Sequence, residues 1–194
     1  WGAEMIDADN DGDLDIWIPY GQLDIPSDVQ GDFDDAGLYN PRHQPDALFL
    51  QGEDGFFSDA AAGWGIDRST VSRGGSWADL NQDGFLDLLS PAVDGPLEAF
   101  LSECDDSAWL KVSLRMPSPN TRAIGAVAEV VAGGRTQRRW MLAGATSVSS
   151  GGPPELHFGL GQTDRIDALR IIWPDQTISE FTDIQTRQSI LVEK

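Results

Sequence analysis

The chain has 194 residues, of which 40% are hydrophobic, so it can form a packed core and its composition argues against global disorder. It carries 13 Lys and Arg against 32 Asp and Glu, a formal net charge of -19, which argues against DNA, RNA and anionic membranes as partners. Every apolar run is shorter than the ~18–20 residues of a membrane-spanning helix, so we expect no membrane insertion.

An aspartate-rich loop comes first in the chain and leads into the apolar segment Ile16–Ile18. It has carboxylates at alternate positions, which are Asp7, Asp9, Asp11 and Asp15. A curled loop with this spacing can aim its carboxylates at one point, and glycine at the sixth position, Gly12, permits the sharp turn. Asp13, at the seventh position, would offer its backbone carbonyl. All donors are oxygen atoms, which favours a hard cation, and calcium over magnesium because calcium accepts a flexible cage of oxygens.

The segment Gln22–Pro45 follows and is acidic and rich in Pro and Gly. We interpret it as a loop insertion. Its role is open, since it can be a binding surface or a solvated loop.

A second aspartate loop lies 72 residues after the first. Its oxygen ligands are Asp79, Asn81, Asp83 and Asp87, with Gly84 sixth and the Phe85 carbonyl seventh. Asn81 replaces an aspartate, and one charge less predicts weaker calcium binding. Neither loop is an EF-hand, because the twelfth positions are Ile18 and Ser90 instead of the glutamate that an EF-hand requires.

The repeat continues beyond the loops, because Asp46–Gln51 resembles Leu97–Ser102. Internal repeats of this kind indicate stacked supersecondary units, with a usual period of ~40–50 residues for a four-stranded blade. We therefore predict two propeller-type blades with calcium loops over residues 1–105.

From residue 106 the aspartate loops stop and short alternating apolar segments begin. They are Trp109–Arg115, Ala126–Ala132, Thr136–Leu142, Glu155–Phe158, Ala168–Trp173, Thr177–Phe181 and Ser189–Val192. Period-2 runs separated by turn residues are typical of an antiparallel sandwich or barrel. Turns are expected at Gly133-Gly134 and Pro174-Asp175. The sequence thus predicts an all-β chain whose second domain, residues 106–194, is a small antiparallel β-sandwich or barrel.

Both halves resemble known families. The two loops, with Trp77-Ala-Asp79 before the second and Gly55–Asp59 after the first, resemble FG-GAP/VCBS repeats, which are blades of integrin-type β-propellers. The part from Trp109 to Glu193 resembles the ASPIC/UnbV domain, through Asn120–Ala126, Gly133-Gly134 with Gln137, His157–Gly161 and Trp173-Pro174. Together they resemble the C-terminal end of cartilage acidic protein-like chains.

The resemblance implies structural calcium, an extracellular or cell-surface location and no established enzymatic activity. Two repeats are too few to close a propeller. The chain is therefore expected to be part of a longer protein, or its two blades must pack against the C-terminal domain.

Three functional classes stay open. The first is a non-catalytic calcium-binding module for adhesion or protein interaction. The second is a calcium-dependent carbohydrate-binding module, an accessory part of a glycan-active protein, for which Trp64 and Trp140 are the candidate ligand-binding residues because flat aromatic rings stack on sugars. The third is a hydrolase, which we do not favour because His157 has no nucleophile motif beside it.

Overall fold

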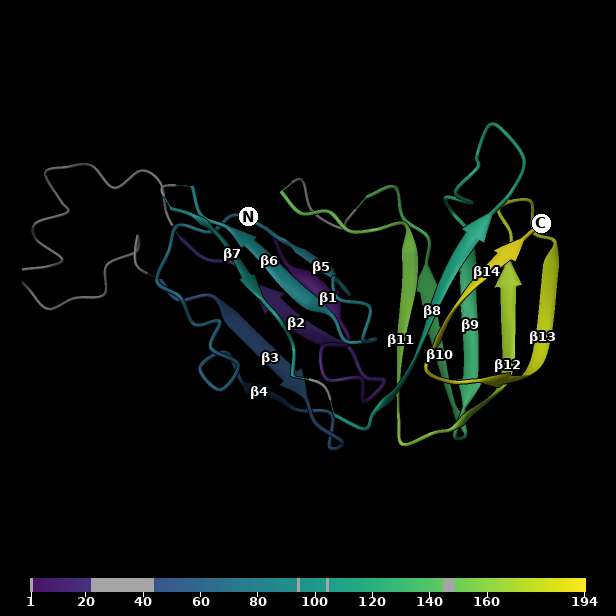
Figure 1. Cartoon of the computed structure of the whole chain (residues 1–194), viewed down its shortest axis with the longest axis horizontal. Helices are drawn as coiled ribbons and strands as arrows, with labels where there is room; N and C mark the ends of the chain where they lie inside the picture. Colours follow the sequence, from purple (N-terminus) through teal and green to yellow (C-terminus); the bar gives the residue numbers. More distant parts are fainter. Residues whose placement is uncertain (1, 22–43, 94, 104, 145–148) are drawn as a thin grey trace, which may run out of the picture.

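The computed structural model describes residues 2–21, 44–93, 95–103, 105–144 and 149–194 of the chain. Within these ranges the chain forms four sheets and no helix, so the predicted all-β class is confirmed (Figure 1). Accordingly, no helix of the described ranges could cross a membrane. Most of the predicted insertion, residues 22–43, lies outside the described residues.

Two sheets form the N-terminal half. The first contains β1 (Glu4–Ile6), β2 (Asp15–Ile18), β3 (Ala47–Gln51) and β4 (Phe57–Asp59) in sequential order, and the second contains β5 (Ser76–Ala78), β6 (Asp87–Pro91) and β7 (Leu97–Phe100). All neighbouring strands are antiparallel. Met5 pairs with Ile16 as Trp77 pairs with Leu88, so the 72-residue repeat is present in the strand register.

One small core joins these two sheets. Trp17 of β2 is fully buried, and its ring meets that of Trp77 of β5 edge to face, with centroids 6.1 Å apart. Leu48 and Leu88 are buried in the same cluster. The apolar residues of both repeats therefore face one another between the two sheets.

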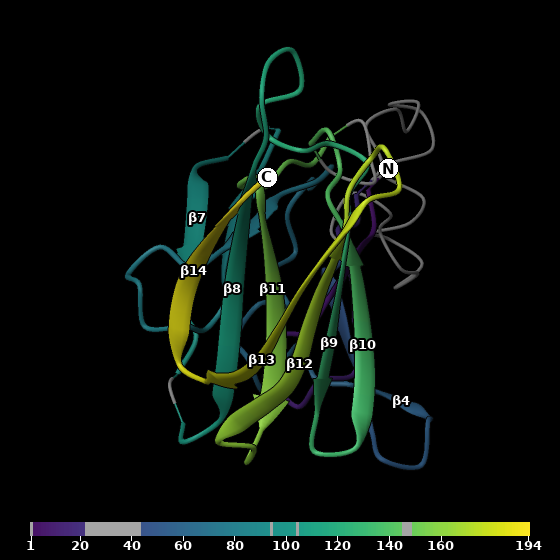
Figure 2. The same ribbon diagram turned by 90° about the vertical axis from the view of Figure 1, so that its right-hand side faces the viewer.

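The described part of the C-terminal half contains seven strands, at the seven segments that the alternating pattern predicts. They are β8 (Ala108–Arg115), β9 (Val127–Ala132), β10 (Arg135–Trp140), β11 (Glu155–Gly161), β12 (Arg165–Ile172), β13 (Ile178–Gln185) and β14 (Gln188–Glu193). One sheet has the order β10-β9-β12-β13 and the other β11-β8-β14. A core that includes Phe158, Met141 and Trp173 receives residues from both sheets, whose strands Figure 2 shows side by side.

The expectation that this half is purely antiparallel is wrong in one place. β14 pairs in parallel with β8, with Gln188 opposite Leu110. The chain leaves β13 through the short turn at Thr186 and Arg187 and joins the other sheet instead of forming a hairpin. Period-2 alternation shows which residues face a core, but it does not show the direction of the neighbouring strand.

The predicted turns have the backbone that their residues favour. Gly133 and Gly134 join β9 to β10 with φ of 56° and 77°, in the left-handed region that glycine accepts at low cost. Between β12 and β13, the Trp173 amide donates to the Thr177 carbonyl at 2.9 Å. Both turns keep their strands in register.

Candidate metal centre

The first aspartate loop joins β1 to β2 and is curled by its own side chains. Asp9 Oδ1 accepts the Asp11 amide at 3.3 Å, and Asp11 Oδ1 accepts the Asp13 amide at 2.8 Å. Asp7 Oδ1 accepts the amide of Gly12 at 3.3 Å. Gly12 has a φ of 94°, so the turn that the sixth position was predicted to make is present.

The loop brings the carboxylates of Asp7, Asp9 and Asp15 together. Their nearest oxygen atoms all lie within 4.8 Å of one another, the single group of this kind within the described ranges. Asp7 and Asp15 are buried, at 2% and 0% exposure. Three convergent hard oxygen donors fit a hard divalent cation.

Asp11 is not in that group of side chains, and Asp13 was predicted to bind through its backbone carbonyl, which that group does not include. The Oδ1 atom of Asp11 accepts a hydrogen bond from the Asp13 amide, as described above. The Asp13 carboxylate forms an ion pair with Arg135 of β10, and the same guanidinium donates to the Asp11 carbonyl at 3.2 Å. Arg135 therefore fixes the outer side of the loop to the C-terminal half.

Burial disfavours the ionised form of these carboxylates while no metal ion is bound to them. It raises the pKa of Asp7 to about 7, although Arg139 and two backbone amides act in the opposite direction. It also raises the pKa of Asp15 to about 6 and that of Asp9 above its ordinary value, and neighbouring aspartates add to both. A bound cation would reverse this effect, because it favours the ionised form.

The last aspartate of each loop links the loop to its sheet in the same way. Asp15 accepts the Ala8 amide at 2.8 Å and the Gln51 amide, at the end of β3, at 2.9 Å. Asp87 makes the matching pair of bonds, to Leu80 at 2.8 Å and Ser102 at 2.9 Å. The repeat therefore extends to the hydrogen bonds of the loops.

The second loop has the same backbone conformation as the first, but its side chains have different hydrogen-bond partners. Asp79 accepts the amides of Asp83 and Gly84 at 3.0 and 2.9 Å, and the Lys111 Nζ donates to Asp79 Oδ2 at 2.6 Å. The Asn81 amide donates to Asp83 Oδ2 at 2.6 Å. Phe85 donates its amide to Asp83 Oδ1 at 2.8 Å, and its side chain is buried.

Strand β11 of the C-terminal half lies against both loops. The Gly159 amide donates to Asp7 Oδ2 at 2.9 Å, and the Gly161 amide donates to the Asn10 carbonyl at 2.8 Å. His157 Nε2 lies 3.1 Å from the Gly84 carbonyl of the second loop. The two glycines contact the first loop through their backbone amides and His157 contacts the second loop through its ring, so β11 joins both loops to the C-terminal half.

His157 therefore contacts the second loop through its ring. Burial lowers its pKa to about 4, so the ring is neutral at physiological pH. A carbonyl oxygen only accepts, so Nε2 carries the proton and donates it to Gly84. This hydrogen bond joins the C-terminal half to the backbone of the second aspartate loop.

Sequence reasoning missed the cationic residues at this junction. Arg139 Nη2 lies 3.7 Å from Asp7 Oδ2, and Lys111 and Arg135 contact the loops as described above. Each lies far along the chain from its aspartate, in a strand without a motif of its own. Only the alternation of β8 and β10 would have shown which side chains share a face.

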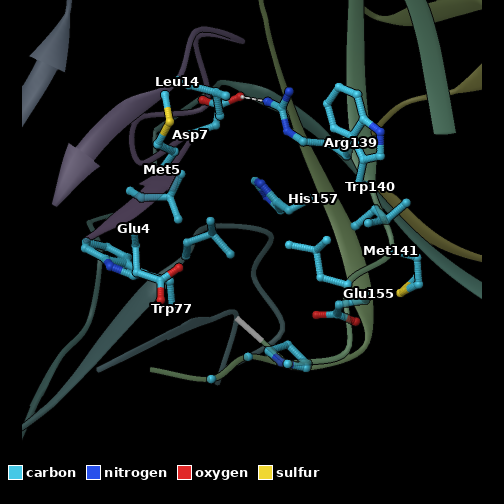
Figure 3. A pocket seen from close by; sticks show the side chains of 18 of the residues that line it. Glu4, Met5, Asp7, Leu14, Trp77, Arg139, Trp140, Met141, Glu155 and His157 are labelled. Carbon is cyan, nitrogen blue, oxygen red and sulfur yellow. Dashed lines mark ion pairs between the residues drawn. The ribbon is translucent and has the colours of Figure 1, made fainter. Parts of the chain in front are cut away.

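A pocket of about 280 Å³ lies beside the first loop, between strands β1 and β5 and strands β10 and β11. Figure 3 shows Asp7 and Arg139 at its top, Glu4 and Trp77 at lower left and Trp140 at the right. Trp140 is 55% exposed, whereas Trp64, the other predicted ligand-binding residue, is half-buried against the N-terminal core and lines no part of this pocket.

Residues 116–194 match the family model described as "ASPIC and UnbV". The match covers strands β9 to β14 and includes the segment His157–Gly161 that contacts both loops. No match was found among curated proteins. The FG-GAP/VCBS character of residues 1–105 stays a prediction.

Proposed function

Since residues 116–194 form an ASPIC/UnbV domain, docked on a buried acidic cluster, we propose that the chain is a non-catalytic calcium-binding module for adhesion or protein interaction. Its setting would be extracellular or at the cell surface, and its calcium would be structural. The observation that carries the proposal is the convergence of Asp7, Asp9 and Asp15 in one buried loop.

The donor set supports calcium as the cation. The three carboxylates would hold it, and the predicted contributions of Asp11 and the Asp13 carbonyl would complete an oxygen cage. Extracellular calcium modules bind with dissociation constants of roughly 10⁻⁴–10⁻³ M, so a loop with modest affinity would be filled outside the cell.

The position of the loop supports a structural role. Asp7 accepts an amide from β11 while it belongs to the acidic cluster, so one carboxylate serves both the metal group and the contact between the halves. A cation would remove the repulsion within the cluster and so stabilise the surface on which the ASPIC/UnbV domain rests. The two N-terminal sheets would be FG-GAP/VCBS-type blades held by this loop.

Thermal unfolding in excess calcium and in excess chelator tests the proposal. A cation at a hundred times its Kd stabilises by about 2.7 kcal/mol, and each kcal/mol raises the Tm of a chain this size by roughly 2–4 °C. We expect a higher Tm in calcium, little effect of magnesium, and a smaller calcium effect in Asp9→Asn. Equal Tm values for the wild type in calcium and chelator would contradict the proposal.

One observation favours a second candidate, calcium-dependent carbohydrate binding. Trp140 presents a half-exposed ring in the pocket beside the metal loop, together with the charged groups of Glu4 and Arg139. An aromatic face with hydrogen-bonding groups at its edge suits a sugar ring.

A glycan array probed with the full chain, with and without calcium, tests this candidate. Binding that needs calcium and is lost in Trp140→Ala, but is kept in the control Trp64→Ala, would support a sugar site in this pocket. Binding to no glycan, or binding that Trp140→Ala leaves unchanged, would exclude it and leave the interaction module.

A further inference from the structure

The two aspartate loops share their backbone but differ in the positive charge beside their first aspartate. Asn10 and Gln82 have φ of 60° and 64°, and Gly12 and Gly84 both have φ of 94°. In the first loop the nearest cation to Asp7 is Arg139, at 3.7 Å, beyond hydrogen-bonding distance. In the second loop, an ammonium group bonds directly to the carboxylate.

That ammonium belongs to Lys111, which reaches the second loop from β8. Its Nζ lies 2.6 Å from Asp79 Oδ2, and the two side chains are 8% and 0% exposed. The ammonium also lies 5.5 Å from the centre of the Trp109 ring. Trp109 in turn packs on Gly84, where a Cβ would lie only 1.8 Å from a ring atom. The Lys111 side chain is thus held in a closed site.

The remaining side-chain ligands of the second loop differ from those of the first loop at one position. Asn81 stands where the first loop has Asp9, and its amide donates to Asp83, whereas Asp87 accepts two backbone amides just as Asp15 does. Within the described ranges, no group of three His, Cys, Asp or Glu side chains converges at this loop, whereas the equivalent positions of the first loop supply the carboxylates of Asp7, Asp9 and Asp15. A metal ion on Asp79 would stand beside the buried ammonium, and two cations sharing one carboxylate repel each other.

We infer that Lys111 takes the place of calcium in the second loop, so that the chain binds one calcium ion, in the first loop. The Asp79–Lys111 pair then joins the two halves at any calcium concentration, while calcium would further stabilise the first loop, whose Asp7 contacts β11. This inference rests on the proposed function for the first loop and corrects the number of calcium ions that the sequence predicts.

Calorimetric titration of calcium into the full chain tests the inference. We expect one site in the wild type, weakened by about tenfold or more in Asp9→Asn because ligand charge sets calcium affinity, and unchanged in Asp83→Asn. Lys111→Met keeps the length of the side chain but removes its charge, so it should gain a second site. Lys194→Met, which removes the other lysine from its surface ion pair with Asp175, should keep one site.

Two sites in the wild type, a site lost in Asp83→Asn, or a single site in both the wild type and Lys111→Met would overturn the inference. The first two results come from variants that retain Lys111, so they decide the question even where Lys111→Met does not fold. No calcium bound by the wild type, with one site in Lys111→Met, would overturn the proposed function and leave the role of Lys111 standing.

Discussion

At the scale of single residues, the junction depends on a glycine that allows close approach. A Cβ at Gly159 would lie 2.4 Å from Asn10 Cα and 2.5 Å from Asp7 Oδ2. Distances below 3 Å do not occur for real Cβ atoms, so β11 and the first loop could not approach each other with a larger residue. The Gly159 amide would then no longer reach Asp7.

Gly159→Ala should therefore destabilise the chain. We expect a loss of about 2–4 kcal/mol in the free energy of unfolding, from overpacking and a buried hydrogen bond. Urea unfolding measures it. The matched control is Gly151→Ala, where an added Cβ meets no atom within 4 Å and φ is not positive. Equal unfolding midpoints for the two variants would mean that the β11 contact adds nothing.

Calcium affinity should depend on pH, because Asp7 must lose a proton to bind. Its pKa rises from 3.8 to about 7 in the calcium-free fold, and that of Asp15 to about 6. Between pH 4 and 7 the calcium-free fold thus holds more protons than the unfolded chain, so these groups contribute less stability as pH rises.

Calcium affinity, in contrast, should rise with pH. We expect it to be constant above about pH 7.5 and to fall roughly tenfold per pH unit where one proton competes with calcium, and more steeply below pH 6. Titrations at pH 5.5, 6.5 and 7.5 measure this, with Asp83→Asn keeping the same profile. If the affinity did not change over this pH range, calcium would bind to residues other than Asp7 and Asp15.

At the scale of elements, the sequence predicted local structure better than it predicted long-range contacts. The repeat, the seven C-terminal strands and the Gly133-Gly134 turn follow from residues close together in sequence. The direction of β14 and the contacts of Lys111 and Arg139 do not, because they join residues between 32 and 132 positions apart. A motif predicted the acidic cluster, but only the folded chain shows which of its carboxylates converge.

The two N-terminal sheets should depend on their shared aromatic pair. Trp17→Ala removes a fully buried indole from the contact with Trp77, and we expect it to cost about 3–5 kcal/mol. Trp140→Ala, at a residue that is 55% exposed, should change the free energy of unfolding by less than about 0.5 kcal/mol. A similar loss in both variants would argue against a core between the sheets.

At the scale of the whole molecule, the aspartate loops are the surface on which the halves meet. Backbone amides of β11 and cations of β8 and β10 all contact loop atoms. In a chain with a formal net charge of -19, these contacts place positive charge where acidic side chains gather. Calcium in the first loop would neutralise the aspartates there, as the Lys111 ammonium neutralises Asp79 in the second loop.

A crystal structure grown with calcium tests this account most directly, with diffraction data collected where calcium scatters anomalously. The account predicts one strong anomalous peak, bound by Asp7, Asp9 and Asp15, and none at Asp79, where the Lys111 ammonium would remain. No peak in the first loop would contradict the calcium proposal, and a peak in the second loop would contradict the role of Lys111.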